Sequence, residues 1–201
     1  WRAFFSALGA FLAAGLLAFA CNPHSSIQYW SDTLRDSNRI GGLAYSSNQS
    51  LRGFFSRLAP EHAEKLWLVA VLLVIALVWF TMERLSQENQ AVLMLLAASV
   101  SLLCSPVSWS HHFTWLVLAG VLLVARRHWG FAALTWLALL ARGHWLVPHA
   151  NDQELGWVWW QHIVGNDYAI VTALLVLCSL PLALRRAGAY QSAAAPASSQ
   201  G

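Results

Sequence analysis

The sequence has very little charge. Only 10% of its 201 residues are Asp, Glu, Lys or Arg and 58% are hydrophobic, with a mean hydropathy of +0.51. Soluble domains carry charge on about a quarter of their residues, so the composition excludes an ordinary soluble domain and indicates an integral membrane protein. The 12 tryptophans agree, because Trp is enriched at membrane–water interfaces. A net charge of only +3 gives no indication of nucleic-acid binding.

Cysteine is scarce as well. The three cysteines, Cys21, Cys104 and Cys178, lack the short spacings of metal sites, and nothing in their positions requires a disulfide. The histidines do not show the H-x-x-x-H spacing that would place two of them on one helix face. We therefore expect neither a metal ion nor a cofactor.

The sequence begins without methionine, and its first residues do not show the pattern of a signal peptide. Residues 3–20 form an apolar run that follows Trp1 and Arg2 directly, without the basic n-region and cleavage site of a secretory signal. We interpret this run as a membrane span and the chain as the C-terminal part of a longer protein. Residues 1–186 would be its membrane domain, and the small-residue, polar segment 187–201 a disordered cytoplasmic tail.

Apolar runs occur along the whole chain. Six of them are candidate spans, at residues 3–20, 66–82, 91–104, 113–125, 129–141 and 168–184. A bilayer core needs about 20 apolar residues per helix. The middle three runs are shorter, so we expect either helices extended by their flanking residues or loops that enter the membrane inside the protein. The predicted fold class is an all-α, multi-pass membrane bundle of about six helices, with short outer helices in residues 21–65 and Pro60 at a helix start.

Basic residues in short loops set the predicted orientation. Arg126 and Arg127 occupy a tight turn between two spans, and Arg185 and Arg186 follow the last span. With both pairs on the cytoplasmic side, residues 21–65, 105–112 and 142–167 face outward. Seven of the eight histidines then lie on that outer face. This predicts that the protein acts on a substrate at the outer leaflet of the cell membrane.

The first polar segment of interest is YSSNQSLRGFFSRL, residues 45–58. It offers amide and hydroxyl groups from Asn48, Gln49 and Ser50, and two guanidinium groups from Arg52 and Arg57. Arg binds phosphate oxygens well. The alternative is an amphipathic helix whose arginines meet lipid headgroups non-specifically, and composition alone favours that alternative.

The second polar segment is SPVSWSHH, Ser105–His112, between two short spans. Imidazoles serve as acids, bases or phosphate partners, while Ser108 and Trp109 add a hydroxyl and an aromatic face for a sugar. Adjacent residues on a helix point about 100° apart, so one of His111 and His112 should line a cavity while the other packs or binds backbone. The alternative is a Trp/His belt at the membrane interface.

A third segment, residues 142–167, carries four tryptophans. It is typical of an amphipathic stretch resting at the interface, although it could cover a lipid-linked substrate. Asp152, Glu154 and Asp167 are carboxylate candidates in it, and no pairing among them is predicted.

Two of these segments resemble motifs of a known family. NQSLRG at Asn48–Gly53 is close to N-Q-S-L-x-G, and SPVSWSHH is close to S-P-[IV]-S-W-S-H-H, with two predicted spans between them. The ordered pair resembles the polyprenyl-phosphate-sugar-dependent glycosyltransferases of family 87, which include actinobacterial α-mannosyltransferases and arabinofuranosyltransferase relatives. The resemblance covers residues 1 to about 186, the C-terminal half of a family member.

The resemblance implies a GT-C fold with its active site at the outer face. Such enzymes pass a sugar from a polyprenyl phosphate donor to a phosphatidylinositol mannoside or lipoglycan acceptor among membrane lipids. Their catalytic base is an aspartate in the first outer loop, so we expect it upstream of this chain and assign it to none of Asp32, Asp36 and Asp152. Arg52 and one of His111 or His112 are candidates for the donor phosphate.

The remaining candidate binding residues are Asn48, Gln49, Ser50, Ser108 and Trp109, which would shape the donor or acceptor pocket. Three alternatives stay open: transfer of arabinofuranose instead of mannose, a transporter, and an assembly subunit of the envelope. The transporter is disfavoured because the spans contain almost no ionisable residues that would mark a path across the bilayer.

Overall fold

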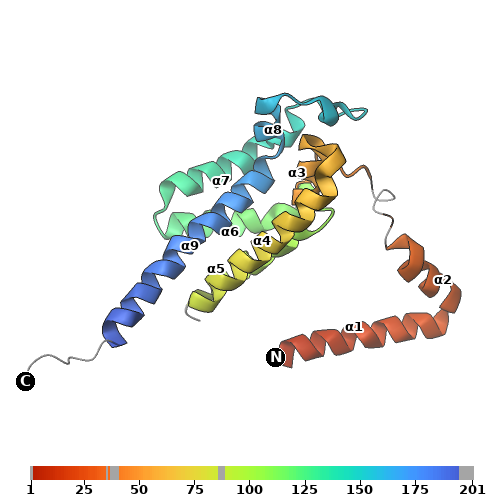
Figure 1. The fold of residues 1–201 in the computed structure, drawn as a ribbon, viewed down its shortest axis with the longest axis horizontal. Helices are drawn as coiled ribbons and strands as arrows, with labels where there is room; N and C mark the ends of the chain where they lie inside the picture. The colour runs from red at the N-terminus through yellow and green to blue at the C-terminus, as the bar shows by residue number, and fades with distance from the viewer. Residues whose placement is uncertain (1, 35, 37–40, 86–88, 195–201) are drawn as a thin grey trace, which may run out of the picture. The chain divides into compact units, whose positions relative to one another are not determined.

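The computed structural model describes residues 2–34, 36, 41–85 and 89–194, and this part of the chain contains helices and no strands (Figure 1). The prediction of an all-α membrane protein is confirmed. The chain divides into two units, Trp1–Gly42 and Leu43–Gly201, and each is described by itself.

The first unit consists of the apolar helix α1 (Arg2–Cys21), the short helix α2 (Pro23–Gln28) and the π-helical turn η1 (Tyr29–Thr33). The side chain of Asn22 accepts a hydrogen bond from Ser25 N at 3.0 Å and so caps the start of α2. The ring of Trp30 packs edge-on against Phe11, at 5.9 Å between centroids, and so joins η1 to α1.

The second unit contains the remaining helices. In chain order they are α3 (Leu51–Leu58), η3 (Pro60–His62), α4 (Ala63–Arg84), α5 (Gln90–Cys104), η5 (Ser110–Thr114), α6 (Trp115–Ala125), α7 (Trp129–Ala141), η6 (Gly143–Trp145), η7 (Gln153–Gly156), α8 (Trp159–Gly165) and α9 (Asp167–Ala194). The predicted short helices before residue 65 are present, with Pro60 at the start of η3.

Two apolar clusters hold this unit together. One joins α4, α5 and α9 through buried residues such as Val78, Leu103 and Val176. The other joins α5, η5, α6, α7 and α9 around Phe113 and Tyr168. Figure 1 shows α4, α5 and α9 running side by side, with α6 and α7 as an adjacent antiparallel pair.

All six predicted apolar runs are helical, but the number of spans stays a prediction. Among the described residues, two helices are long and apolar enough to cross a membrane, Phe4–Cys21 and Pro60–Arg84. A third would form if α8 and α9, which meet at an angle of 76°, act as one broken span. The predicted tail begins inside α9, which continues to Ala194, and residues 195–201 lie outside the described residues.

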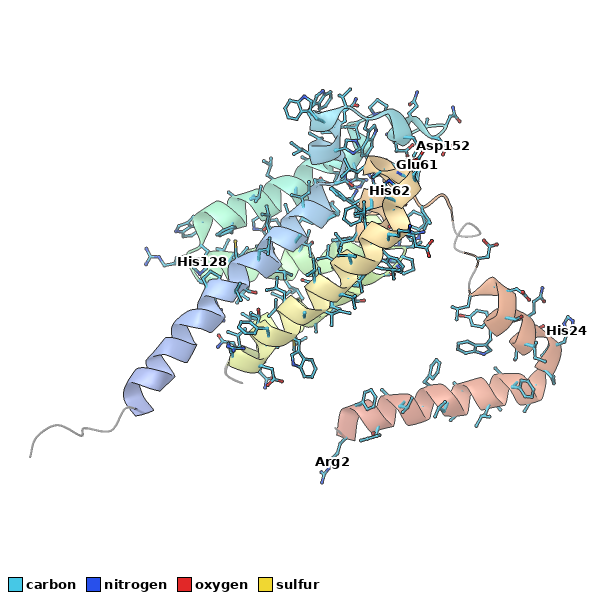
Figure 2. All side chains as sticks on the ribbon, in the orientation of Figure 1. Arg2, His24, Glu61, His62, His128 and Asp152 are labelled. Carbon is cyan, nitrogen blue, oxygen red and sulfur yellow. The ribbon has the colours of Figure 1, made fainter. Side chains whose placement is uncertain are left out.

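Polar segments of the second unit gather at one end. Glu61, His62 and Asp152 lie at the end formed by α3 and α8, whereas His128 lies at the opposite end, where α6 turns into α7 (Figure 2). Within the second unit, residues from 43 onward of the segment 21–65 meet the segments 105–112 and 142–167 at the first of these ends, through the hydrogen bonds described below. Which end faces the cell exterior stays a prediction.

Candidate functional site

The two motifs are joined side by side. Residues 46–50 and 106–110, called the paired segments here, run antiparallel, with an isolated β-bridge between Asn48 and Trp109. Gln49 N donates to Ser108 O at 2.8 Å. The structure thus brings together two segments that lie about 60 residues apart in the sequence.

Asn48 fixes the register of this pairing. Its Oδ1 accepts from Ser108 N at 3.0 Å, and its Nδ2 donates to Leu43 O at 3.0 Å and Pro106 O at 3.2 Å. The side chain is fully buried. A buried amide without hydrogen-bond partners is costly. These hydrogen bonds of the Asn48 side chain therefore stabilise this conformation of the loop.

Ser50 links the same register to helix α3. Its hydroxyl donates to Pro106 O and accepts from Gly53 N, both at 3.1 Å, so Ser50 is the N-cap of α3. A Cβ on Gly53 would lie 2.3 Å from Asn48 O. Only glycine therefore allows the first turn of α3 to pack against this loop.

Gln49 connects the paired segments to the end of α8 and the start of α9. Its Nε2 donates to Ser46 O at 2.7 Å and to Gly165 O at 2.8 Å, and its Oε1 accepts from Ala169 N at 3.4 Å. Like Asn48, it is fully buried. The side chains of Asn48, Gln49 and Ser50 therefore hold the backbone of the site in place. Their direct contact with a sugar stays a prediction.

Arg52 is better placed to bind an anion. Its guanidinium lies over the ring of Trp67, at 5.3 Å from the centroid, and its Nη2 is 3.7 Å from Glu64 Oε2. The Nη1 atom is buried and has no hydrogen-bond partner in the described part of the chain. With 16% of the side chain exposed, Arg52 offers an unused donor close to the surface.

The histidine pair is exposed. His111 and His112 lie on the 3-10 helix η5 with both side chains accessible and ring centroids 4.4 Å apart. The expectation that one of them packs was wrong, because the turn buries the next residue, Phe113, instead. Burial and then the charge of His111 lower the pKa of His112.

Arg52 and the histidines lie at opposite ends of the paired segments. Arg52 follows Ser50 and contacts Trp67, whose Nε1 donates to Cys104 O at 3.1 Å. The histidines follow Ser110, whose hydroxyl is 3.0 Å from that of Ser47. Trp109, half-buried, lies between these ends, so the candidate residues line one edge of the unit rather than a single point.

Arg57 has a structural role that the sequence did not reveal. It was predicted to be available for phosphate, yet it is buried and donates to Asn166, to the carbonyls of Ala44 and Tyr45, and to Asn48 O at 2.9 Å. Burial lowers the pKa of Arg57 to about 9, an effect that the nearby charge of Glu154 partly offsets. Arg57 holds the loop before the paired segments in place.

Two of the three carboxylate candidates have partners elsewhere in the fold. Glu154 is buried and accepts from Ser46 N at 3.0 Å. Asp167 accepts from Gly143 N at 2.7 Å and lies 3.2 Å from Nδ1 of the buried His144. No sequence spacing could show these contacts, because each joins segments far apart in the chain. The described residues contain no group of three His, Cys, Asp or Glu side chains able to hold a metal ion.

An apolar cavity of about 160 Å³ is lined by residues of α5, α6, α7 and α9 and of the turn between α6 and α7. Its lining includes Leu96, Leu116 and Val176, with Arg126 and His128 among the few polar contributors. None of the candidate site residues lines it.

Comparison with known proteins identifies the family. The sequence profile of glycosyltransferase family 87 matches residues 1–106, more than half of the 201 residues. The chain belongs to glycosyltransferase family 87. This confirms the resemblance seen in the two motifs, although the profile match includes the whole of NQSLRG and ends at Pro106, inside the second motif.

Curated relatives of this family 87 chain come from mycobacteria. A protein of Mycobacterium tuberculosis named polyprenol-phosphate-mannose-dependent alpha-(1-2)-phosphatidylinositol mannoside mannosyltransferase is 33% identical over 196 residues, 92% of this chain and 45% of the relative. A Mycolicibacterium smegmatis protein of the same name is 33% identical over 78% of this chain and 39% of its own length.

A further M. tuberculosis relative is named as the corresponding pentamannoside mannosyltransferase. It is 32% identical over 72% of this chain and 36% of its own length. The family 87 chain thus spans less than half the length of these relatives. No solved structure is significantly similar to it.

Proposed function

We propose that this chain is part of a membrane glycosyltransferase that moves a mannosyl residue from polyprenyl phosphate to a phosphatidylinositol mannoside or lipoglycan. The observation that carries the proposal is the 33% identity, over 92% of the chain, with a relative named for a reaction of this kind. The pairing of the two motifs along one edge of the second unit also supports it, because the candidate binding residues come from both motifs.

Donor binding is the task we assign to Arg52 or to one of His111 and His112, because Arg52 and the histidines lie at opposite ends of the paired segments. The departing polyprenyl phosphate accumulates negative charge as the glycosidic bond breaks, so fixed donors around it lower the barrier. The buried Nη1 of Arg52 lacks a partner within the described residues, and a phosphate oxygen would supply one. A phosphate leaving group is already anionic, so the step needs no metal ion.

The other candidate residues determine the shape of the site. Asn48, Gln49, Ser50 and Ser108 hold the paired segments in register and so form the wall of the pocket. Trp109 offers an aromatic face to a sugar ring. The base that removes the proton from the acceptor hydroxyl is expected in the first outer loop of family members, beyond the residues assigned here.

The reaction would take place at the outer face of the cell membrane, where the polar end of the second unit would lie. The names of the reported relatives favour mannose over arabinofuranose. A transporter or an assembly subunit would not need residues that bind a donor phosphate.

Mass spectrometry of lipoglycans tests the function in cells. Cells that lack the gene should lose α-mannosyl branches or accumulate a shorter phosphatidylinositol mannoside, and the intact gene should restore them. Loss of arabinan branches instead would indicate the arabinofuranosyltransferase, and an unchanged lipoglycan profile would contradict both enzymes.

Single variants of the full-length gene product test the donor site. Arg52→Gln should reduce sugar transfer by roughly 100-fold, the order expected when one fixed donor to a developing anion is lost. His111→Ala and His112→Ala should separate the imidazole that matters from the one that does not. His128→Ala, exposed at the opposite end of the unit, is the matched control. Normal transfer by all three site variants at normal membrane abundance would refute the assignment.

A further inference from the structure

Four rings form a continuous row beside the paired segments. Trp109 contacts Tyr45 at 6.0 Å between ring centroids, Tyr45 contacts Trp145 at 6.1 Å, and Trp145 contacts His149 at 5.1 Å. Tyr45 is 39% exposed, and the other three rings are half-buried. This aromatic row is built from three segments that are far apart in the sequence, so its continuity exists only in the folded unit.

The backbone under the aromatic row is firmly held. The carbonyl of Tyr45 accepts from Arg57 Nη1 and from Asn48 N, at 2.9 and 2.8 Å. Trp145 N donates to Arg142 O at 2.9 Å. The row is therefore organised before any ligand arrives, which reduces the entropy cost of binding.

Two other tryptophans of this unit are far more exposed than those in the row. Trp159 and Trp129 are 76% and 60% exposed, as expected of side chains that lie at a membrane interface. The rings of the row instead pack against one another and leave part of each surface open. That arrangement suits a ligand lying along the row better than a lipid interface.

Polar groups flank the rings. The imidazole of His149 ends the row, and the exposed His111 and His112 follow Trp109 at the other end. The hydroxyls of Ser47 and Ser110 adjoin Trp109. Apolar faces combined with a few hydrogen-bonding groups match a sugar, whose C–H face stacks on a ring while its hydroxyls form hydrogen bonds.

We propose that the aromatic row is a subsite for the oligosaccharide headgroup of the acceptor, with successive sugars on successive rings. This inference rests on the proposed function and adds where the acceptor glycan lies. It places the acceptor on the side of Trp109 that faces Tyr45 and Trp145, and the donor phosphate toward Arg52 or the histidines.

The test compares acceptors that share one lipid anchor but carry different numbers of mannosyl residues. The full-length protein is assayed in membranes with polyprenyl phosphate mannose as donor. Tyr45→Ala and Trp145→Ala should each raise the acceptor KM by roughly tenfold, the order expected for a lost aromatic contact, and should abolish any preference for longer glycans. The donor KM and kcat should change far less.

Three control variants make the result specific. Tyr45→Phe keeps the ring and should retain the wild-type acceptor KM, whereas Tyr45→Leu keeps apolar bulk without an aromatic face and should behave like Tyr45→Ala. The leucine variant serves if the alanine variant fails to fold. Trp159→Ala should leave the acceptor KM unchanged.

The outcomes separate two failures. No mannosyl transfer by the wild-type protein to any of these acceptors would overturn the proposed function itself. Normal transfer combined with an unchanged acceptor KM in Tyr45→Ala and Trp145→Ala would overturn only the subsite. An equal rise in Trp159→Ala would show that the rings act as a membrane anchor, and would also overturn it.

Discussion

Gly53, the last residue of NQSLRG, packs against Asn48, the first. The backbone carbonyl of Asn48 occupies the space where a Cβ on Gly53 would lie, at 2.3 Å. The identities of Asn48, Ser50 and Gly53 are thus explained by one local structure, a capped helix start pressed against a loop. Arg52 lies in the same helix start, and its Nη1 has no hydrogen-bond partner among the residues that the structure describes.

Gly53→Ala should lower the free energy of unfolding by about 1–3 kcal/mol, the usual cost of forcing an extra methyl group into a packed interior. Thermal unfolding of the detergent-purified protein, followed by fluorescence, measures the change. The control is Gly130→Ala in α7, where a Cβ would meet nothing within 4 Å. Equal stability of the two variants would contradict the close approach at Gly53.

His111→Ala should raise the pKa of His112. Burial is the larger cause of the lowered pKa of His112 and remains in the variant, but the repulsion from His111 is removed. The pKa should therefore move up while staying below 6.5, the ordinary value for histidine. NMR titration of labelled histidines measures it. His128→Ala is the control, and a pKa of His112 that fails to rise would count against the ring contact.

At the scale of elements, the paired segments decide how the loops at the α3–α8 end of the second unit fit together. Neither segment is a strand, yet Asn48 and Gln49 give the pairing a defined register through their side-chain amides. Gln49 also reaches Gly165 at the end of α8. The loops between helices thereby form one connected layer at the α3–α8 end of the unit.

A designed disulfide tests this register. Ser47→Cys combined with Ser110→Cys should form a disulfide on mild oxidation, because the two hydroxyl oxygens are 3.0 Å apart and a disulfide requires neighbouring Cβ atoms. The three native cysteines are replaced first, and mass spectrometry of peptides detects the bond. Ser47→Cys with Ser101→Cys, within α5, is the matched control. A bond in the control but not in the first pair would place the loops in another register.

At the scale of the whole molecule, the second unit carries its polar groups at two ends of unequal character. The α3–α8 end holds the paired segments, the buried Arg57 network and the aromatic row. The other end is the short turn of Arg126, Arg127 and His128. Basic residues in short loops stay in the cytoplasm, so the polar-rich end should face outward.

Reporter fusions test this orientation. A tag after Arg127 should report the cytoplasm, and one after Asn151 should report the exterior. The opposite result for both tags would place the candidate site at the inner leaflet and would exclude the outer-face reaction. The same side for both tags would instead mean that α7 does not cross the membrane.

The site was only partly predictable from the sequence. The motif letters pointed to Asn48, Gln49, Ser50 and Ser108, but not to their burial, because a polar residue in a loop gives no sign of the carbonyls that it will meet. Arg57 looked like a surface cation for the same reason. Its partners come from the preceding loop and from Asn166, more than 100 residues away.

The sequence alone determined the helical membrane class, the positions of the six apolar helices and the family, because hydropathy and short motifs are local properties of the chain. Tertiary structure decided which polar side chains form hydrogen bonds that hold the loops together. It also decided which ones, such as Arg52 and the histidines, remain available to bind a ligand. It also decided the alignment of Tyr45, Trp109, Trp145 and His149. Such choices depend on hydrogen bonds and ring contacts between distant segments, which exist only after the helices have packed.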